Sequence, residues 1–277
     1  MSALAQSMLS RTAGRVWSRL LEATDIAAAA IPILCYHSIS DEPHAINPAR
    51  FAAQMRWLRR RGYRGVGLEQ VVHPTPPCGG DRRVVITFDD GLADLEANAL
   101  PVLVECGLRA IIFFSPALAG MTAWYSPRTR AMVTSPEEGA KRLDFMSWEQ
   151  ADRMAAAGMS FQSHGWSHAR LSALDYGELV DELSRSRRVL EEHFGTPVRF
   201  LSYPFGDFDA PTQQAAAGLG YMGAASTRPG FSGPGCDRYA LRRVAPNPTD
   251  DLCAFAFKLS PAAGWYYRRT RPPEDGG

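Results

Sequence analysis

Short apolar runs alternate with amphipathic segments along most of this 277-residue chain. Runs rich in β-forming residues end near His37, Asp90, Ser115, His164 and Pro204, and residues with the apolar spacing of a helix lie between them. Strand and helix units of this length, repeated in this way, are typical of a parallel sheet covered by helices. About seven such units favour closure of the sheet. We therefore predict an α/β fold, a distorted (β/α) barrel of about seven parallel strands.

The clearest helix signal is SWEQADRMAAAG, in which Ser147 is expected to cap the helix and Gln150 to complete a capping box. No comparable pattern marks residues 116–143, which contain Trp124 and Tyr125. Long loops in compact domains are often functional. We predict that this insertion is irregular and that it covers a substrate site on the barrel.

Composition excludes several classes of protein. Apolar residues make up 45% of the chain and charged residues 21%, which is ordinary for a globular domain. The 30 basic and 29 acidic side chains give a net charge of +1, so no overall field attracts nucleic acid. The five cysteines are widely spread and form no close pairs, which argues against a zinc ribbon or a disulfide framework.

Residues 1–29 predict an N-terminal helix rather than a secretory signal. Charged residues such as Arg11, Arg15 and Arg19 interrupt every apolar stretch, while leucines and methionines recur at roughly helical spacing. Packing of this helix on the domain is the simpler interpretation, and a peripheral contact with a membrane surface is the alternative. We expect no transmembrane segment, a cytoplasmic location, one domain over residues 30–262 and a flexible tail over residues 263–277.

The apolar run VVITFDDG ends in two adjacent carboxylates, Asp89 and Asp90. In a parallel barrel the carboxyl ends of the strands converge on the face where catalytic groups collect. An alternative is that one carboxylate caps the following helix while the other is a surface acid. The residues alone leave both interpretations open.

Two histidines four residues apart, His164 and His168, follow another predicted strand in QSHGWSH. If the chain turns helically after His164, this spacing places both imidazoles on one side, where they can bind a single divalent ion. The alternative is a pair of surface histidines. Together with one carboxylate from the neighbouring strand end they would leave open positions on a zinc-like ion, which is typical of a catalytic site.

A third strand, in LSYPFGDF, ends at Pro204 and Gly206. A simple turn is one interpretation. The other is that the backbone N–H of Phe205 or Gly206 points into the site and donates a hydrogen bond to a developing oxyanion.

The motifs TFDDG, HGWSH and YPFG, in this order, resemble those of the NodB-type polysaccharide deacetylases, a carbohydrate esterase family. The resemblance runs from about residue 33 to residue 244. It implies the same distorted (β/α) barrel that the alternation predicts. The opening YHSI is similar to the branch that deacetylates poly-N-acetylglucosamine or other exopolysaccharides.

Roles for the motif residues follow from this resemblance. It implies that Asp90, His164 and His168 hold one divalent metal ion, zinc first, with cobalt or nickel as alternatives. It further implies that Asp89 is the general base and that the Phe205 amide stabilises the oxyanion. Residues of the same motifs, Tyr203, Pro204 and Trp166, are expected to contact substrate.

The chain also departs from the family pattern. The late histidine that serves as an acid in many members is missing, since the last histidine is His193, and Ser202 replaces the arginine that often precedes the proline motif. His37, at the end of the first strand, is our candidate for the acid. Arg242 and Arg243 are candidates for a contact with substrate or with the base, and only one of two adjacent strand residues is expected to face inward.

The sequence therefore predicts a metal-dependent hydrolase that removes N-acetyl groups from N-acetylhexosamine units of a bacterial polysaccharide or its precursor. The partner is an N-acetylated oligo- or polysaccharide and not a nucleic acid. One alternative keeps the fold and the metal but acts as a deformylase or amidase on a lipid-linked aminosugar. Another is a catalytically silent carbohydrate-binding homologue, although such a protein would have no need of the acid at Asp89.

Overall fold

The computed structural model describes residues 30–74, 81–126, 131–133, 139–233, 235–260, 262–263 and 267. The helix predicted within residues 1–29 lies outside the described residues, as does most of the tail predicted for 263–277. None of the helices in the described part is both long and apolar enough to cross a membrane.

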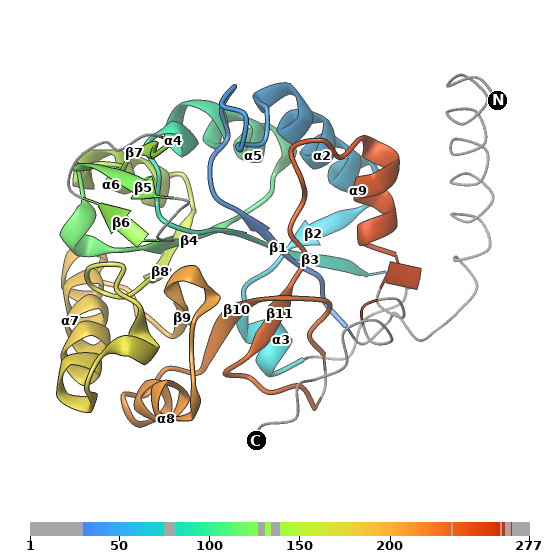
Figure 1. Ribbon diagram of the computed structural model, residues 1–277. Helices are drawn as coiled ribbons and strands as arrows, with labels where there is room; N and C mark the ends of the chain where they lie inside the picture. The colour runs from blue at the N-terminus through green and yellow to red at the C-terminus, as the bar shows by residue number, and fades with distance from the viewer. Residues whose placement is uncertain are drawn as a thin grey trace.

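Parallel strands form the centre of the molecule (Figure 1). In spatial order they are β1 (Ile33–Tyr36), β3 (Arg82–Phe88), β4 (Ile111–Phe114), β8 (Ser160–Ser163), β9 (Phe200–Ser202), β10 (Gly223–Pro229) and β11 (Leu241–Arg243). A short strand, β2 (Tyr63–Gly65), pairs with β3 outside this series. A parallel bridge between Leu34 and Val244 joins β1 to the end of β11. The sheet is thereby a nearly closed barrel of seven parallel strands among the described residues, which confirms the predicted fold.

Helices surround this barrel (Figure 1). They are α2 (Pro48–Arg60), α3 (Glu69–Val72), α4 (Asp94–Asn98), α5 (Leu100–Cys106), α6 (Trp148–Ala156), α7 (Tyr176–Phe194), α8 (Ala210–Gly218) and α9 (Leu252–Lys258). The 3₁₀ turns are η3 (Pro116–Leu118), η4 (Leu171–Ala173) and η5 (Pro204–Gly206). The predicted capping box of Ser147 and Gln150 is present at the start of α6. A second box, of Asp175 and Glu178, begins α7, which ends at Gly195 with φ of 63°.

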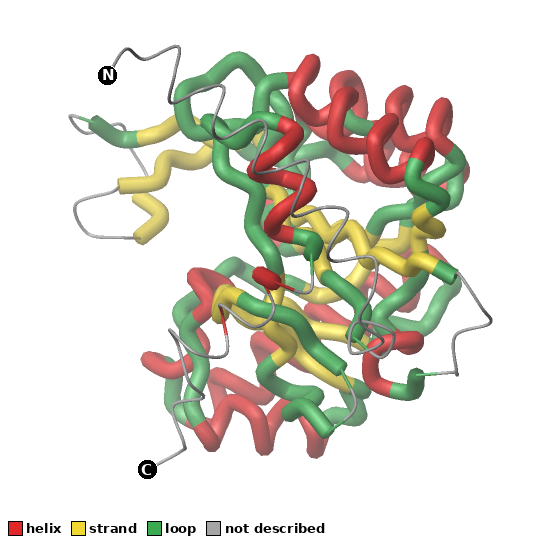
Figure 2. The backbone as a smooth tube through the Cα atoms, turned by 90° about the vertical axis from the view of Figure 1, so that its right-hand side faces the viewer, coloured by secondary structure: helices red, strands yellow, loops and turns green. Residues whose placement is uncertain are grey.

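The insertion after β4 differs from the irregular loop that we predicted. It contains an antiparallel sheet in which β5 (Thr122–Ser126) lies between β6 (Ala131–Val133) and β7 (Lys141–Asp144). Figure 2 shows these strands projecting from one side of the body of the molecule. No strong strand signal marks this sheet in the sequence, because each strand is short and the residues of β5 and β7 are mostly only partly buried.

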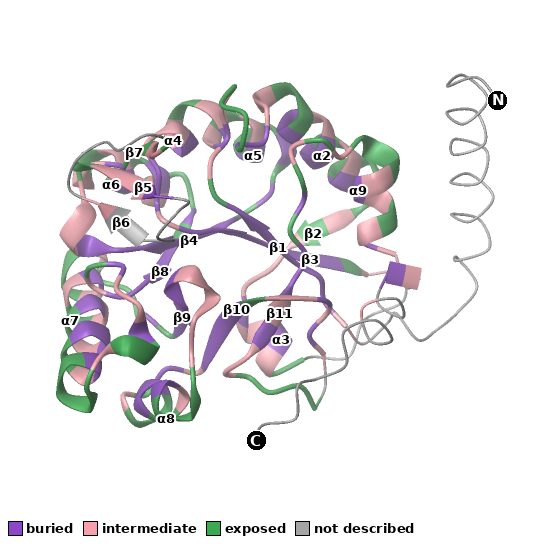
Figure 3. Cartoon of the chain, viewed as in Figure 1, coloured by how far each residue is buried: buried purple, intermediate pink, exposed green. Residues whose placement is uncertain are grey.

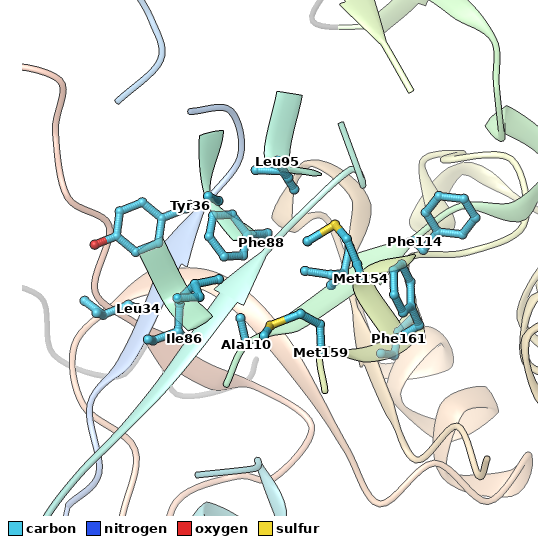
Figure 4. Packing of buried hydrophobic residues seen from close by; sticks show 14 of the residues in the cluster. Leu34, Tyr36, Ile86, Phe88, Leu95, Ala110, Phe114, Met154, Met159 and Phe161 are labelled. Atoms are coloured by element: carbon cyan, nitrogen blue, oxygen red, sulfur yellow. The ribbon is translucent and has the colours of Figure 1, made fainter. Parts of the chain in front are cut away.

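The side chains of each barrel strand alternate between two environments. Val84, Ile86 and Phe88 of β3 pack into the main core under the helices, whereas Val85 belongs to a second cluster with Ile111 and Phe113 of β4, Phe200 and Leu241. Figure 4 shows the first environment, where Leu34, Ile86 and Phe88 pack with Met154 and Met159. In Figure 3 the barrel strands are coloured mostly as buried. With a period of two, odd-numbered residues of β1, β3 and β11 therefore face the barrel interior.

Candidate metal centre and active site

The two carboxylates at the end of β3 diverge. Asp89 keeps the alternation of Val85 and Thr87, so it faces the barrel interior, and it is only 2% exposed. Asp90 and Gly91 both have φ of 68°, which turns the chain sharply away from the strand. A Cβ added at Gly91 would lie 2.4 Å from Cδ2 of Phe114, so this turn requires glycine. Positive φ at Asp90, a residue with a Cβ, is backbone strain of the kind that clusters at functional sites.

Asp90, His164 and His168 converge on one point. Asp90 Oδ1 lies 3.2 Å from His164 Nε2 and 3.0 Å from His168 Nε2. The ligand atoms of the three residues all lie within 4.8 Å of one another. Around a tetrahedral zinc ion, oxygen and nitrogen ligands are separated by about 3.4 Å, given metal to ligand distances near 2.0–2.2 Å. The triad is therefore close to the size that one ion requires.

Hydrogen bonding also favours a cation at this point. His164 Nδ1 lies 2.7 Å from the backbone oxygen of Ser202, and a carbonyl can only accept, so Nδ1 carries the proton. In the neutral ring, Nε2 then carries no hydrogen, and its lone pair faces the carboxylate of Asp90. Two acceptors in contact need a proton or a metal ion between them. Fixing the tautomer from behind in this way is what protein groups do for histidine ligands of metals.

The helical turn after His164, which was the condition for bringing the two histidines together in the sequence analysis, is not present. Gly165 and His168 have φ of 73° and 62°, so the segment between the two ligands is an irregular loop. The ring centroids nevertheless lie 4.8 Å apart. His168 Nδ1 is buried and has no hydrogen-bond partner among the described residues.

Helix α7 holds this loop at several points. Glu182, which is 8% exposed, accepts hydrogen bonds from the backbone N–H of Ser167 at 2.6 Å and from its hydroxyl at 3.1 Å. The Arg185 guanidinium carbon lies 3.9 Å from the ring centroid of Trp166. A Cβ on Gly165 would come within 3.0 Å of Glu182 Oε1, so glycine leaves room for this carboxylate. The loop between the two histidines is thereby fastened to a 19-residue helix.

Asp89 forms a buried ion pair with Arg243 of β11. Arg243 Nη1 lies 2.7 Å from Asp89 Oδ1 and Nη2 lies 2.6 Å from Oδ2, a bidentate arrangement. The remaining N–H groups of the guanidinium donate to Thr87, Ser202 and the backbone oxygen of Ser226. Burial raises the pKa of Asp89, but the positive charge of Arg243 outweighs it and lowers the pKa to about 2. The carboxylate is ionised at neutral pH.

This pair decides between our two predictions for Arg243, a contact with substrate or a contact with the candidate base. The side chain is 2% exposed and all five of its N–H donors have partners inside the protein, so it lies behind the carboxylate of Asp89 and away from substrate. Arg243 thus reaches Asp89 beside Ser202, the position where the family pattern had led us to expect an arginine. Arg242, its neighbour, points the other way, as strand alternation requires.

His37 lies at the open side of the site. It is exposed, and one of its ring nitrogens lies within 4.8 Å of a carboxylate oxygen of Asp89 and of Cys35 Sγ. The turn after it is fastened to α4, because Ser38 donates to Asp94 and the Asn98 amide donates to the backbone oxygen of Ile39 at 2.7 Å. An exposed imidazole ring therefore lies beside the buried carboxylate of Asp89.

Three other predicted site residues lie elsewhere. Tyr203 and Pro204, which we expected to contact substrate, are buried: Tyr203 follows the outward side of β9, stacks on Phe208 and donates to the backbone oxygen of Tyr239 at 2.8 Å. Trp166 is half-buried beneath Arg185 on α7. For Tyr203 the cause is the side of the strand that it takes, because the motif fixes a position in sequence but not whether a residue faces inward or outward.

Phe205 is at the rim of the site. Its φ of 61° turns the chain after β9, and its ring lies 4.6 Å from that of His168 in an edge-on arrangement. The Arg170 guanidinium carbon lies 4.5 Å from the centre of the same ring. A donor role for its amide stays a prediction.

Sequence reasoning missed Cys35, Ser202 and Glu182. Cys35 Sγ lies 3.8 Å from Asp89 Oδ2, and the Ser202 hydroxyl lies 3.2 Å from the same atom. Strand alternation would have found the first two, because Cys35 lies two residues before His37 and Ser202 two residues after Phe200 on inward-facing positions. No signal in the sequence points to Glu182, which lies in the middle of a long helix.

The contact of Glu182 with the ligand loop makes a prediction about metal affinity. Glu182→Gln removes the charge that holds Ser167 and should weaken zinc binding about 10-fold, as loss of a residue that orients a metal ligand typically does. Competition with a chromophoric chelator measures this. Glu192→Gln is the matched control, since Glu192 is an exposed residue of the same helix. Equal zinc affinities in the two variants would remove Glu182 from this role.

Comparison with known sequences agrees with this site. Residues 77–224 match the family described as polysaccharide deacetylase. YxkH of Bacillus subtilis (strain 168), which is named after the same family, is 31% identical over 235 residues, 82% of this chain and 75% of YxkH. The poly-β-1,6-N-acetyl-D-glucosamine N-deacetylase of Escherichia coli (strain K12) is 26% identical over 157 residues, 53% of this chain but only 22% of that protein.

Solved structures share the fold. The Streptococcus pyogenes deacetylase PplD, in complex with acetate, superposes with a TM-score of 0.71 over 84% of this chain and 100% of that chain, at 23% identity. IcaB from Ammonifex degensii gives a TM-score of 0.68 over 83% of this chain and 97% of that chain, at 24% identity. The family match covers more than half of this chain, and the alignment with YxkH, at 31% identity, covers 82% of it. The chain therefore belongs to the polysaccharide deacetylase family, whose members hydrolyse N-acetyl bonds of carbohydrates.

Proposed function

We propose that this protein removes acetyl groups from N-acetylhexosamine units of a bacterial polysaccharide or its precursor, with one divalent ion, zinc first, held by Asp90, His164 and His168. The observation that carries the proposal is the convergence of this triad at one point, with the separate buried carboxylate of Asp89 beside it. A site that only bound sugar would have no reason to bury a second charge there, since burial of a carboxylate is costly. Cobalt or nickel could occupy the same ligands.

Asp89 is suited to accept a proton. A divalent ion at such a site supplies polarisation of the amide carbonyl and activation of water. Asp89 then takes the proton of the attacking water, while Arg243 orients the carboxylate and keeps it ionised. The same arginine lowers the basicity of Asp89, since its pKa is about 2.

His37 is suited to deliver a proton to the leaving amine. Its exposure lets substrate reach it, and a ring nitrogen within 4.8 Å of an Asp89 carboxylate oxygen supports a role close to the proposed base. Asp94 and Asn98 hold the turn that follows His37, which limits its motion. On the other side of the site, the Phe205 amide would donate to the oxyanion of the tetrahedral state. His37 thus takes the part of the late histidine that this chain lacks.

The choice of substrate polymer rests on the names of related proteins. The E. coli protein that matches 53% of this chain is named as a poly-β-1,6-N-acetyl-D-glucosamine N-deacetylase, and we take this polymer as the first substrate to test. Removal of a formyl group from a lipid-linked aminosugar would use the same residues. Measuring acetate and formate separately distinguishes the two.

The principal test replaces the base. Asp89→Asn should lower acetate release from N-acetylglucosamine oligomers by about 10²–10⁴-fold, the usual contribution of a general base, while zinc stays bound at one equivalent because the triad is intact. Acetate release and bound zinc are both measured. Asp181→Asn, which changes an exposed carboxylate of α7, is the control and should keep full activity. Full activity in the Asp89 variant would disprove its role as base.

A second test separates the acid from the other groups. His37→Asn should slow hydrolysis of the N-acetyl amide by about 10²-fold or more, since an amine leaves poorly without a proton. An aryl acetate ester, whose phenolate leaves unprotonated, should be hydrolysed at nearly the original rate. The control is His44→Asn, because His44 is exposed in the same loop. An equal loss on amide and ester would show that His37 is not the acid.

A further inference from the structure

A second group of metal-binding side chains lies beside the triad. Cys35 and His37, at the end of β1, and Asp89, at the end of β3, each offer one ligand atom, and these atoms all lie within 4.8 Å of one another. The residues meet because β1 and β3 are neighbours in register, and alternate residues of both strands face the same interior. The Cys35 thiol has no role in the function proposed above.

The dimensions of this group suit a zinc-like ion. With zinc to sulfur distances near 2.3 Å and zinc to oxygen distances near 2.1 Å, tetrahedral geometry separates the two ligand atoms by about 3.6 Å. Cys35 Sγ and Asp89 Oδ2 are 3.8 Å apart. The thiol now donates its hydrogen to that oxygen. An ion that displaces this proton would occupy the space between the same two atoms with little movement of either.

The group also has a way in from solvent. Cys35 and Asp89 are buried, but the imidazole of His37 is exposed and can receive an ion first. A thiolate, an imidazole and a carboxylate together form a donor set that binds zinc or cadmium in preference to magnesium or calcium. Arg243 opposes a cation here, because its guanidinium is paired with Asp89. The second ion would therefore bind more weakly than the ion of the triad.

We propose that Cys35, His37 and Asp89 form a second, inhibitory site for a zinc-like divalent cation. Binding converts the Cys35 thiol to a thiolate, and the displaced proton leaves to solvent. The ion then holds Asp89 and His37 at once. In the function proposed above, on which the inhibitory effect rests, these are the base and the acid. Excess zinc would silence the enzyme by occupying both, while the first ion stays in the triad.

The site can be tested without any assay of activity. Cadmium bonded to a thiolate gives an ultraviolet charge-transfer band, and the triad of Asp90, His164 and His168 contains no sulfur. In a protein with Cys78, Cys236 and Cys253 replaced by serine, the first equivalent of Cd²⁺ should give no band and the second should produce one. Adding Cys35→Ser should abolish the band. Adding Cys106→Ser instead, which alters another buried thiol, should leave it unchanged.

Two results of this titration would overturn the proposal. One is that the second equivalent of Cd²⁺ produces no ultraviolet band. The other is that the band persists after Cys35→Ser. Thermal unfolding of both serine variants confirms that each is folded before the comparison is made.

Inhibition is tested separately. In the parent protein, zinc beyond one equivalent should stop acetate release, and Cys35→Ser should raise the half-inhibiting zinc concentration at least about 10-fold, each activity being normalised to that variant without excess zinc. Identical zinc inhibition in Cys35→Ser and Cys106→Ser would contradict the inhibitory role. If no substrate releases acetate at all, the proposed function fails, whereas the cadmium band still decides whether the second site exists.

Discussion

The buried ion pair between Asp89 and Arg243 is the interaction on which the site depends. It joins β3 to β11 across the interior, and the same guanidinium contacts Ser202 of β9 and the backbone of Ser226 in β10. Removal of one partner from such a pair typically costs about 3–5 kcal/mol, because the other charge is left buried without compensation. The barrel interior can therefore hold the charged carboxylate of Asp89 at its carboxyl end because a second strand supplies the matching cation.

Around this pair, three helices hold the parts of the site that strands do not. The carboxylate of Glu182 on α7 holds the loop between the two histidines, and α4, through Asp94 and Asn98, holds the turn after His37. The Asp90 turn instead depends on Gly91, which packs against Phe114, and Phe114 in turn contacts Trp148 of α6 at 5.2 Å between ring centres. Each reactive group is thus supported by a different surrounding element.

Much of this arrangement could be predicted from the sequence. Strand and helix alternation is enough to indicate the barrel, and parallel strands necessarily bring Asp90 and His164 to one end. The geometry between them was less accessible. The spacing of the histidines suggested a helical turn as one way to bring them together, whereas the positive φ at Gly165 and His168 accompanies tertiary contacts of this loop with α7. Tyr203 was misplaced because a motif gives spacing, whereas burial depends on the register of β9 in the sheet.

We propose that three side chains, from two strand ends and one loop, hold a single divalent ion. Anomalous diffraction at the zinc absorption edge, from crystals grown with one equivalent of zinc, tests it most directly. We predict one strong peak about 2.0–2.2 Å from Asp90 Oδ1 and from the Nε2 atoms of His164 and His168. A map with no peak between these three residues, in crystals that contain zinc elsewhere, would contradict the account.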